Sequence, residues 1–313
     1  MSGAGLAGGY LADLLLGDPG RFHPVAGFGR LALRAQSATY APTRARGVAY
    51  AVLLVGAASG AGELGARVAA RHGLSRLTVL AVVTWAALGG RSLTRVAARL
   101  AGQLEAGDLA GARTTLPCLC GRDPQALDAH GLARAALESV AENTSDAVVG
   151  ALLWGAVAGP GGVAGYRAAN TLDAMVGHRS PRYADFGWAS AKLDDALNWP
   201  AARLSALMTA LCAPVVGGSP RATWAIVRRD GAKHPSPNAG RAEAAFAGAL
   251  GVRLGGPLAY AGVAELRPAI GDGGGPTTVD LRRALRLSRA VGAAAAVTCA
   301  ALRSLLAPRR SAA

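Results

Sequence analysis

Charged and aromatic residues are scarce in this chain of 313 residues. Only 17% of the residues are charged and 5% are aromatic, whereas 51% are hydrophobic. A soluble domain normally has about a quarter of its residues charged, so the sequence lacks the solvated surface of a typical soluble protein. Small residues are abundant, with 43 glycines, and they allow helices to pack closely in a bilayer. The composition favours a helical membrane protein over the alternative, an alanine-rich soluble helical protein.

Cysteine is also rare, and the four cysteines do not make a disulfide framework. Cys118 and Cys120 are too close in sequence for an ordinary bridge, and no second pair accompanies them at a zinc-binding spacing. We interpret all four as free thiols. The sequence has no P-loop, no G-x-S-x-G nucleophile elbow and no H-E-x-x-H motif, so it offers none of the sites that those motifs build.

Acidic residues are outnumbered by basic ones, 19 against 33, which gives a net charge of +14 at pH 7. The arginines are spread over polar segments, and no groove-reading helix, aromatic ladder or zinc spacing accompanies them. We therefore expect no nucleic-acid partner. Attraction to membrane lipid headgroups and to a phosphorylated substrate accounts for the charge more simply.

Apolar stretches recur along the chain. After an apolar N-terminal segment they cover residues 47–62, 77–90, 147–165, 204–218 and 290–302. A simple span needs about 20 apolar residues, and flanking arginines lengthen a shorter stretch by snorkelling. We predict an all-α, multi-pass membrane protein with one domain over residues 1–313 and a flexible connection at about residues 271–278.

One apolar stretch is interrupted by Gly159-Pro160-Gly161-Gly162. Proline removes a helix donor and glycine loosens the backbone, so we predict a broken or re-entrant helix within residues 147–165. A re-entrant pair would bring the polar clusters on its two flanks, residues 138–146 and 167–198, to the same side of the membrane. A straight crossing would separate them.

Three carboxylates precede this break at helical spacing. Glu138, Glu142 and Asp146 stand at i, i+4 and i+8, so they share one face of a helix and repel one another. Mg²⁺ prefers oxygen ligands and often binds through one or two carboxylates together with substrate phosphates. A magnesium site is the leading interpretation, and a solvated acidic helix face is the alternative that spacing alone leaves open.

Further polar residues that could carry chemistry follow the break or flank it. Asp194 and Asp195 are adjacent, and neighbouring helical residues point about 100° apart, so only one of them is expected to face a site. The other candidates are Asn143, Arg167, Asn170, Asp173, Lys192 and Asn198, then Arg122 and Asp123 upstream, His23 near the N-terminus, and His234, Ser236 and Asn238 in a donor-rich turn.

In this order the motifs resemble the adenosylcobinamide-phosphate synthase family of cobalamin biosynthesis, known as CobD or CbiB. The matching runs are LLLGDP…HPV, GRD…LD, ESVAENTSDAVVGALLW, YRAANTLDAMVGH, YADFGWASAKLDDALNWPAARL and SPNAG…EAAFAGALGVRLGG. Ala151, His178 and Arg241 depart from the family pattern, and the acidic and amide positions are intact.

The resemblance implies a multi-pass enzyme of the cell membrane that joins aminopropanol, or its phosphate, to the propionate carboxylate of the corrinoid adenosylcobyric acid. It implies ATP, which would drive the ligation through an acyl phosphate, and Mg²⁺. Other enzymes of the cobalamin pathway are expected partners. A non-catalytic membrane corrinoid transporter or assembly subunit is the alternative from another class.

Roles follow from this resemblance as hypotheses. The magnesium candidates are Glu138, Glu142, Asp146 and Asp195, and Asp173 and Asp194 could share that task. Phosphate binding is assigned to Arg122, Arg167 and Lys192. His23 and His234 are candidate bases or hydrogen-bond donors to the corrinoid.

Overall fold

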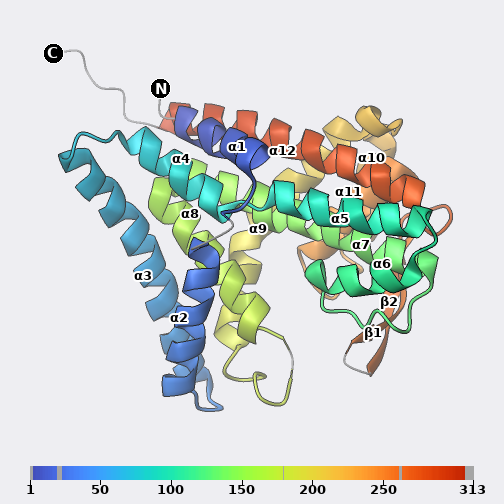
Figure 1. The fold of residues 1–313 in the computed structure, drawn as a ribbon, viewed down its shortest axis with the longest axis horizontal. Coiled ribbons are helices and arrows are strands. Elements are labelled where there is room, and N and C mark those ends of the chain that lie inside the picture. Colours follow the sequence, from blue (N-terminus) through green and yellow to red (C-terminus); the bar gives the residue numbers. More distant parts are fainter. Residues whose placement is uncertain (1–2, 20–22, 179, 261–262, 307–313) are drawn as a thin grey trace. The chain divides into compact units, whose positions relative to one another are not determined.

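The computed structural model describes residues 3–19, 23–178, 180–260 and 263–306 and is almost wholly helical (Figure 1). Its α-helices are α1 (Ala4–Leu16), α2 (Pro24–Thr39), α3 (Arg44–Arg71), α4 (Arg76–Ala87), α5 (Gly90–Glu105), α6 (Leu109–Thr115), α7 (Ala129–Asn143), α8 (Ala151–Val176), α9 (Trp188–Cys212), α10 (Pro220–Asp230), α11 (Ala239–Leu250) and α12 (Thr278–Leu306). Shorter turns are the 3₁₀ helices η1 (Leu116–Cys118) and η3 (Ala213–Val216) and the π-helix η2 (Thr144–Gly150). The all-α prediction is confirmed.

Five helical segments in the described part of the chain are long and apolar enough to cross a membrane. They are Arg44–Arg71, Arg76–Glu105, Ala129–Val176, Trp188–Val216 and Thr278–Leu306, and each contains one of the five predicted apolar stretches or most of it. Helix α3 keeps Val52 and Leu53 62% and 70% exposed, which suits contact with lipid rather than with water. The chain is a multi-pass membrane protein, as predicted.

The chain forms two compact units. Unit 1 consists of Met1–Gly89, Ala147–Asn198 and Ala295–Ala313, and unit 2 consists of Gly90–Asp146 and Trp199–Ala294. The predictions of a single functional domain and of a flexible connection at residues 271–278 stay predictions.

Small residues bring the helices of unit 1 together. Gly5 and Gly9 of α1 lie directly against Leu80 and Thr84 of α4, where a β-carbon would meet those side chains at 3.0 and 2.6 Å. Gly161 and Gly165 of α8 pack on Ser59 of α3 in the same way. Close backbone approach of this kind is typical of membrane helices.

The predicted break lies inside α8. Gly159 has φ 65° and ψ −149°, which is not helical, and Pro160 follows it. Glycine alone adopts such angles without strain, and proline cannot donate the hydrogen bond that would continue the helix. The broken helix is therefore confirmed, and whether it re-enters the membrane stays a prediction.

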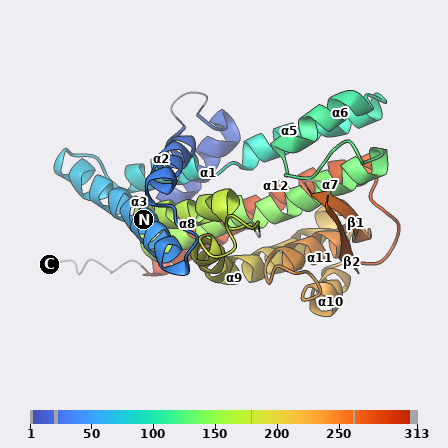
Figure 2. The ribbon, with the colours of Figure 1, turned by 90° about the horizontal axis from the view of Figure 1, so that it is seen from below.

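Unit 2 contains a feature that was not predicted, an antiparallel hairpin of β1 (Leu254–Tyr260) and β2 (Val263–Ile270). The pairing runs from Leu254 opposite Ile270 to Tyr260 opposite Val263, with an irregularity between Leu254 and Gly256. Gly255 and Gly256 have φ of 82° and 96°, so glycine is needed at this bulge. Figure 2 shows the hairpin beside α7 and α11, the two helices of the candidate site.

Capping residues set the ends of the helices around the candidate site. Asp128 caps α7, because its Oδ1 atom accepts a hydrogen bond from the Gly131 amide at 2.7 Å. Gly251 ends α11 in the left-handed conformation, with φ 72°. Ser219 caps α10 and Pro220 occupies its first turn.

Candidate active site

A buried ion pair lies at the bottom of the candidate site in unit 2. Arg122 contacts Glu138 of α7, and their side chains are 3% and 1% exposed. The loop that carries Arg122 is fastened to α7 because the Ser139 hydroxyl donates to the Leu119 carbonyl at 2.7 Å. Glu138 also accepts a hydrogen bond at 2.8 Å from the Gly255 amide at the bulge of the hairpin. Glu138 therefore joins three segments that are distant in sequence.

One helical turn further, Glu142 meets two groups from other elements. Its carboxylate, the His234 ring and the Glu243 carboxylate of α11 offer ligand atoms that all lie within 4.8 Å of one another. Glu142 is half-buried, whereas Glu243 and His234 are buried. In the part of the chain that the structure describes, this is the one group of three acidic, histidine or cysteine side chains close enough to share a metal ion.

Arginine from the hairpin completes the cluster. The Nη1 atom of Arg267 on β2 lies 3.8 Å from Oε1 of Glu243 and 2.9 Å from Nε2 of His234. Three carboxylates, Glu138, Glu142 and Glu243, thus face two guanidinium groups. One negative charge is left over, and burying it costs several kcal/mol unless a proton or a cation neutralises it.

The excess negative charge of the cluster is least compensated at the carboxyl of Glu243. Neither of its oxygens accepts an N–H or O–H hydrogen bond from the described residues, although its side chain is 1% exposed. Burial, together with the negative charges of Glu142 and Glu138, holds the pKa of Glu243 well above its usual range. This carboxyl therefore takes up a cation, or a proton that it can share with Glu142.

His234 lies between two N–H donors. Its Nδ1 atom is 2.9 Å from the Ser236 amide nitrogen, and its Nε2 atom is 2.9 Å from Nη1 of Arg267. Burial, reinforced by the positive charge of Arg267, lowers the pKa of His234 to about 4, so the ring is neutral at pH 7. A neutral imidazole has one acceptor nitrogen and one N–H. Its single acceptor nitrogen is used by either the Ser236 amide or Arg267, so no lone pair is left to bind a metal.

The donor set therefore fits Mg²⁺ through two carboxylates rather than through three ligands. Glu142 and Glu243 supply oxygens, which Mg²⁺ prefers, and the ion usually completes its octahedron with water and substrate phosphates. The oxygens of Glu243, which accept no hydrogen bond from the described residues, are where such an ion would bind. Asp146 lies in η2, and magnesium binding by Asp146 or Glu138 stays a prediction.

Two of the predicted binding residues shape the turn that follows His234. Ser236 accepts hydrogen bonds from the Asn238 and Ala239 amides at 3.3 and 3.2 Å. The Asn238 side chain accepts one from Arg203 at 3.0 Å. These contacts fix the turn against α9 and hold the His234 ring beside the carboxylates.

Two more of the predicted residues shape the segments around α7. Asp123 closes a turn by accepting a hydrogen bond from the Gln125 amide at 2.9 Å. Asn143, at the end of α7, donates to the Ser139 carbonyl at 2.9 Å. Substrate binding by Asp123 and Asn143 stays a prediction.

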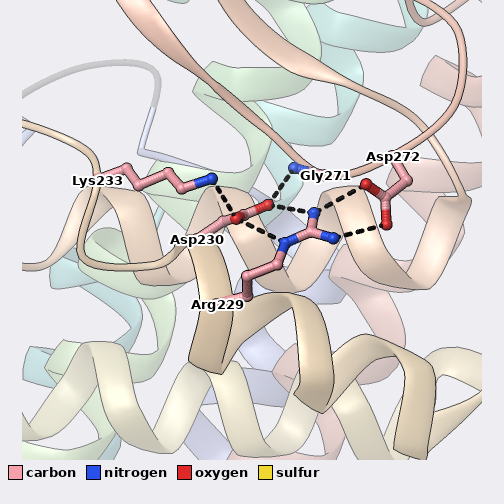
Figure 3. A network of polar contacts seen from close by, with 5 residues as sticks. All are labelled: Arg229, Asp230, Lys233, Gly271 and Asp272. Atoms are coloured by element: carbon pink, nitrogen blue, oxygen red, sulfur yellow. Dashed lines mark hydrogen bonds and ion pairs between the residues drawn. The ribbon is translucent and has the colours of Figure 1, made fainter.

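A salt-bridge network holds the two segments that deliver His234 and Arg267 (Figure 3). Asp230, 1% exposed, accepts from Arg229 at 2.8 and 2.7 Å, pairs with Lys233 at 2.7 Å and accepts from the Gly271 amide at 2.8 Å. The hydrogen bond from Arg229 holds the pKa of Asp230 well below its usual range. Asp230 therefore ties the turn before His234 to the end of β2.

The polar residues after the helix break form a second cluster, in unit 1. Arg167 donates to Asn170 at 3.0 Å, and Asn170 faces Asp194 of α9 at 3.4 Å. The Tyr166 hydroxyl donates to the amide oxygen of Asn198, which is 1% exposed. These contacts join α8 to α9.

The remaining acids of this second cluster lie around the same two helices. Charges on Asp173, Asp194 and Asp195 interact across α8 and α9. Lys192 pairs with Asp195 at 3.8 Å. The metal-binding and phosphate-binding roles predicted for these residues stay predictions.

His23 has a structural place at the start of α2. Its Nδ1 atom accepts from the Val25 amide at 3.2 Å, which caps the helix, and Nε2 lies 4.0 Å from Asp18. The catalytic role predicted for His23 stays a prediction.

Two members of the unit 2 cluster, Glu243 and Arg267, were not singled out in the sequence. Glu243 stands among buried small residues of α11, so an acid on an apolar helix face was the signal that could have found it. Arg267 had no local signal, because the hairpin that carries it was not predicted.

Comparison with known proteins finds one family over nearly the whole chain. The family described as "CobD/Cbib protein" matches residues 6–288. The chain is 55% identical over 290 residues to the cobalamin biosynthesis protein CobD of Mycobacterium tuberculosis strain H37Rv, covering 92% of each chain. It is 43% identical to the CobD protein of Rhodobacter capsulatus, covering 88% of this chain and 90% of that one, and 42% identical to that of Pelobacter propionicus, covering 85% and 84%. No solved structure matches the chain.

Proposed function

Because the chain belongs to the CobD/Cbib family and its relatives are named cobalamin biosynthesis proteins, we propose that it is the ligase that adds an aminopropanol side chain to a corrinoid. The substrates would be adenosylcobyric acid, ATP and either aminopropanol or its phosphate. The product would be adenosylcobinamide or its phosphate, made at the cell membrane.

The chemistry needs an activated carboxylate, because amide formation from a carboxylate and an amine is uphill in water. In the proposed route the propionate oxygen attacks the γ-phosphorus of ATP, which releases ADP and leaves an acyl phosphate. The amine then attacks the acyl carbon, and the C–O bond to phosphate breaks. The departing phosphate titrates near neutral pH and can take the proton that the amine loses. The reaction therefore does not require His234 as a base.

The neighbouring carboxylates of Glu142 and Glu243 in unit 2 support this proposal most directly. Glu142 and Glu243 would hold Mg²⁺, which when bound would offset the charge of the nucleotide phosphates. Arg267 lies beside them with 14% of its side chain exposed and can bind a carboxylate or phosphate oxygen. Arg122 is engaged by Glu138, so we assign it to positioning rather than to phosphate binding.

The neutral His234 has a related role. It lies 3.8 Å from Glu243 and 2.9 Å from Arg267, so it contacts both the acidic and the basic group that would bind the two substrates. We assign it to orienting these groups, with Ser236 fixing the ring from the other side.

The proposal is tested with membranes that contain the chain, supplied with adenosylcobyric acid, ATP, Mg²⁺ and each amine in turn. Mass spectrometry should detect a corrinoid amide with one of the two donors, and none when ATP is withheld. Membranes carrying Glu243→Gln should make little product. No amide with either donor would contradict the proposal, and corrinoid transport without any covalent change would favour a transporter.

A further inference from the structure

Two stripes of arginine lie on neighbouring helices of unit 2. Residues at i, i+4 and i+7 or i+8 fall on one face of a helix, and arginines occupy these positions on both α5 and α12. The arginines of the first stripe are Arg91, Arg95 and Arg99, and those of the second are Arg282, Arg286 and Arg289. All except the half-buried Arg91 are exposed.

The two stripes adjoin. Arg282 donates to the two oxygens of Glu105, at the end of α5, at 3.0 and 2.9 Å. Beside this contact, Ala98 of α5 and the arginines of α12 line a surface hollow of about 320 Å³. Figure 1 shows the ribbons of α5 and α12 next to each other, and the Arg282–Glu105 contact joins the two helices.

Two acidic side chains, Glu105 and Asp280, pair with arginines of α12. Glu105 is engaged by Arg282, and Asp280 pairs with Arg283 at 2.9 Å. Among the described residues, Arg95, Arg99 and Arg286 have no acidic partner within ion-pair distance. Arg286 therefore faces the hollow without an acidic partner among the described residues, and Arg95 and Arg99 add two such positive charges on the adjoining stripe.

Both stripes stand next to an apolar stretch of a candidate membrane span. Residues 77–90 come directly before Arg91, and residues 290–302 come directly after Arg289. An arginine at the end of a span extends its guanidinium to the depth of the lipid phosphates. Arginines at these positions are therefore suited to reach lipid phosphates.

We propose that Arg95, Arg99, Arg286 and Arg289, the arginine rim, bind the phosphates of anionic phospholipids. Anionic headgroups attract basic residues beside a span. A soluble phosphate would account for the arginines but not for the two apolar stretches beside them. A phospholipid headgroup accounts for both. This inference is independent of the proposed reaction.

Native mass spectrometry of the full chain in detergent tests the rim, with phosphatidylglycerol and phosphatidylcholine supplied in equal amounts. The test variant replaces the four rim arginines by glutamine. A matched control removes four exposed arginines elsewhere, Arg30, Arg34, Arg221 and Arg228. The ratio of bound phosphatidylglycerol to phosphatidylcholine should fall on the order of tenfold in the test variant and less than about twofold in the control.

Additional variants distinguish loss of positive charge from loss of folding. A variant with lysine at the four rim positions keeps the charge and should retain the preference, and its melting temperature checks folding. If the glutamine variant does not fold, the pair Arg95→Gln and Arg99→Gln is measured instead, with an expected fall of about threefold or more. Equal losses in test and control variants would overturn the proposal. Displacement of phosphatidylglycerol by ATP or inorganic phosphate, with loss of ATP binding in the test variant, would also overturn it.

Discussion

Arg122 and Glu138 form an ion pair with only 3% and 1% of their side chains exposed, and the same carboxylate accepts the Gly255 amide. Removing one partner leaves the other charged and buried, which typically costs about 3–5 kcal/mol. We expect Glu138→Gln and Arg122→Gln each to lower the melting temperature of the protein in detergent strongly. Thermal unfolding followed by intrinsic fluorescence measures this effect.

The matched control for that pair is Arg282→Gln at the exposed contact with Glu105, where the expected loss is below about 1 kcal/mol. A double replacement, Arg122→Met with Glu138→Leu, removes both charges and should be less destabilising than either single change. Wild-type stability in both single variants would show that the pair does not hold the site together.

Protonation of His234 should make the stability of the protein depend on pH. Its pKa is lowered from 6.5 to about 4 by burial and by Arg267, so the unfolded chain binds the proton more tightly than the folded chain. The contribution of the neutral ring to the free energy of unfolding is therefore present above about pH 6.5 and is lost as the pH falls toward 4. Wild type should lose up to about 3 kcal/mol more over this range than His234→Gln. Parallel pH curves for the two proteins would contradict the assignment.

Loss of a magnesium-holding carboxylate should appear in binding as well as in turnover. We expect Glu142→Gln and Glu243→Gln to reduce amide formation by about a hundredfold or more, with the protein still inserted in the membrane. Calorimetric titration with Mg²⁺ and a non-hydrolysable ATP analogue should show weaker metal binding in both. Glu105→Gln, an exposed acid on α5, is the control. Wild-type turnover in Glu142→Gln would remove that residue from the site.

The break in α8 gives a prediction about the backbone. Gly159 has φ 65°, a conformation that costs a residue with a β-carbon about 1–3 kcal/mol, and Arg303 lies close to where that carbon would be. We expect Gly159→Ala to lower the melting temperature. Gly60→Ala in the regular helix α3, where nothing lies within 4 Å, should be neutral or slightly stabilising. Equal behaviour of the two variants would argue against a required break.

Several features of the fold could be predicted from local sequence signals. The five apolar stretches became the five candidate spans, because composition and length decide whether a helix can cross a bilayer. The break at Gly159-Pro160 followed from the backbone limits of two residue types. The hairpin could not be predicted in this way, because its strands are short and its bulge depends on contact between Gly255 and a helix more than a hundred residues away.

The candidate site was predicted in part. Helical spacing placed Glu138 and Glu142 on one face, and the structure brings Glu142 together with His234. The difference in the roles of the two acids was not visible, because it depends on tertiary partners: Arg122 neutralises Glu138, whereas Glu142 has a second carboxyl, Glu243, beside it. The prediction that the polar clusters of the two units share one site stays a prediction.

In the proposed reaction ATP activates the corrinoid propionate and the amine captures it. Adenosylcobyric acid carrying ¹⁸O in that carboxylate tests both steps in one measurement. We expect the amide product to keep one labelled oxygen and the other to appear in inorganic phosphate, in equal amount to the ADP formed. Amide formation with no label in phosphate, or no amide at all, would contradict it.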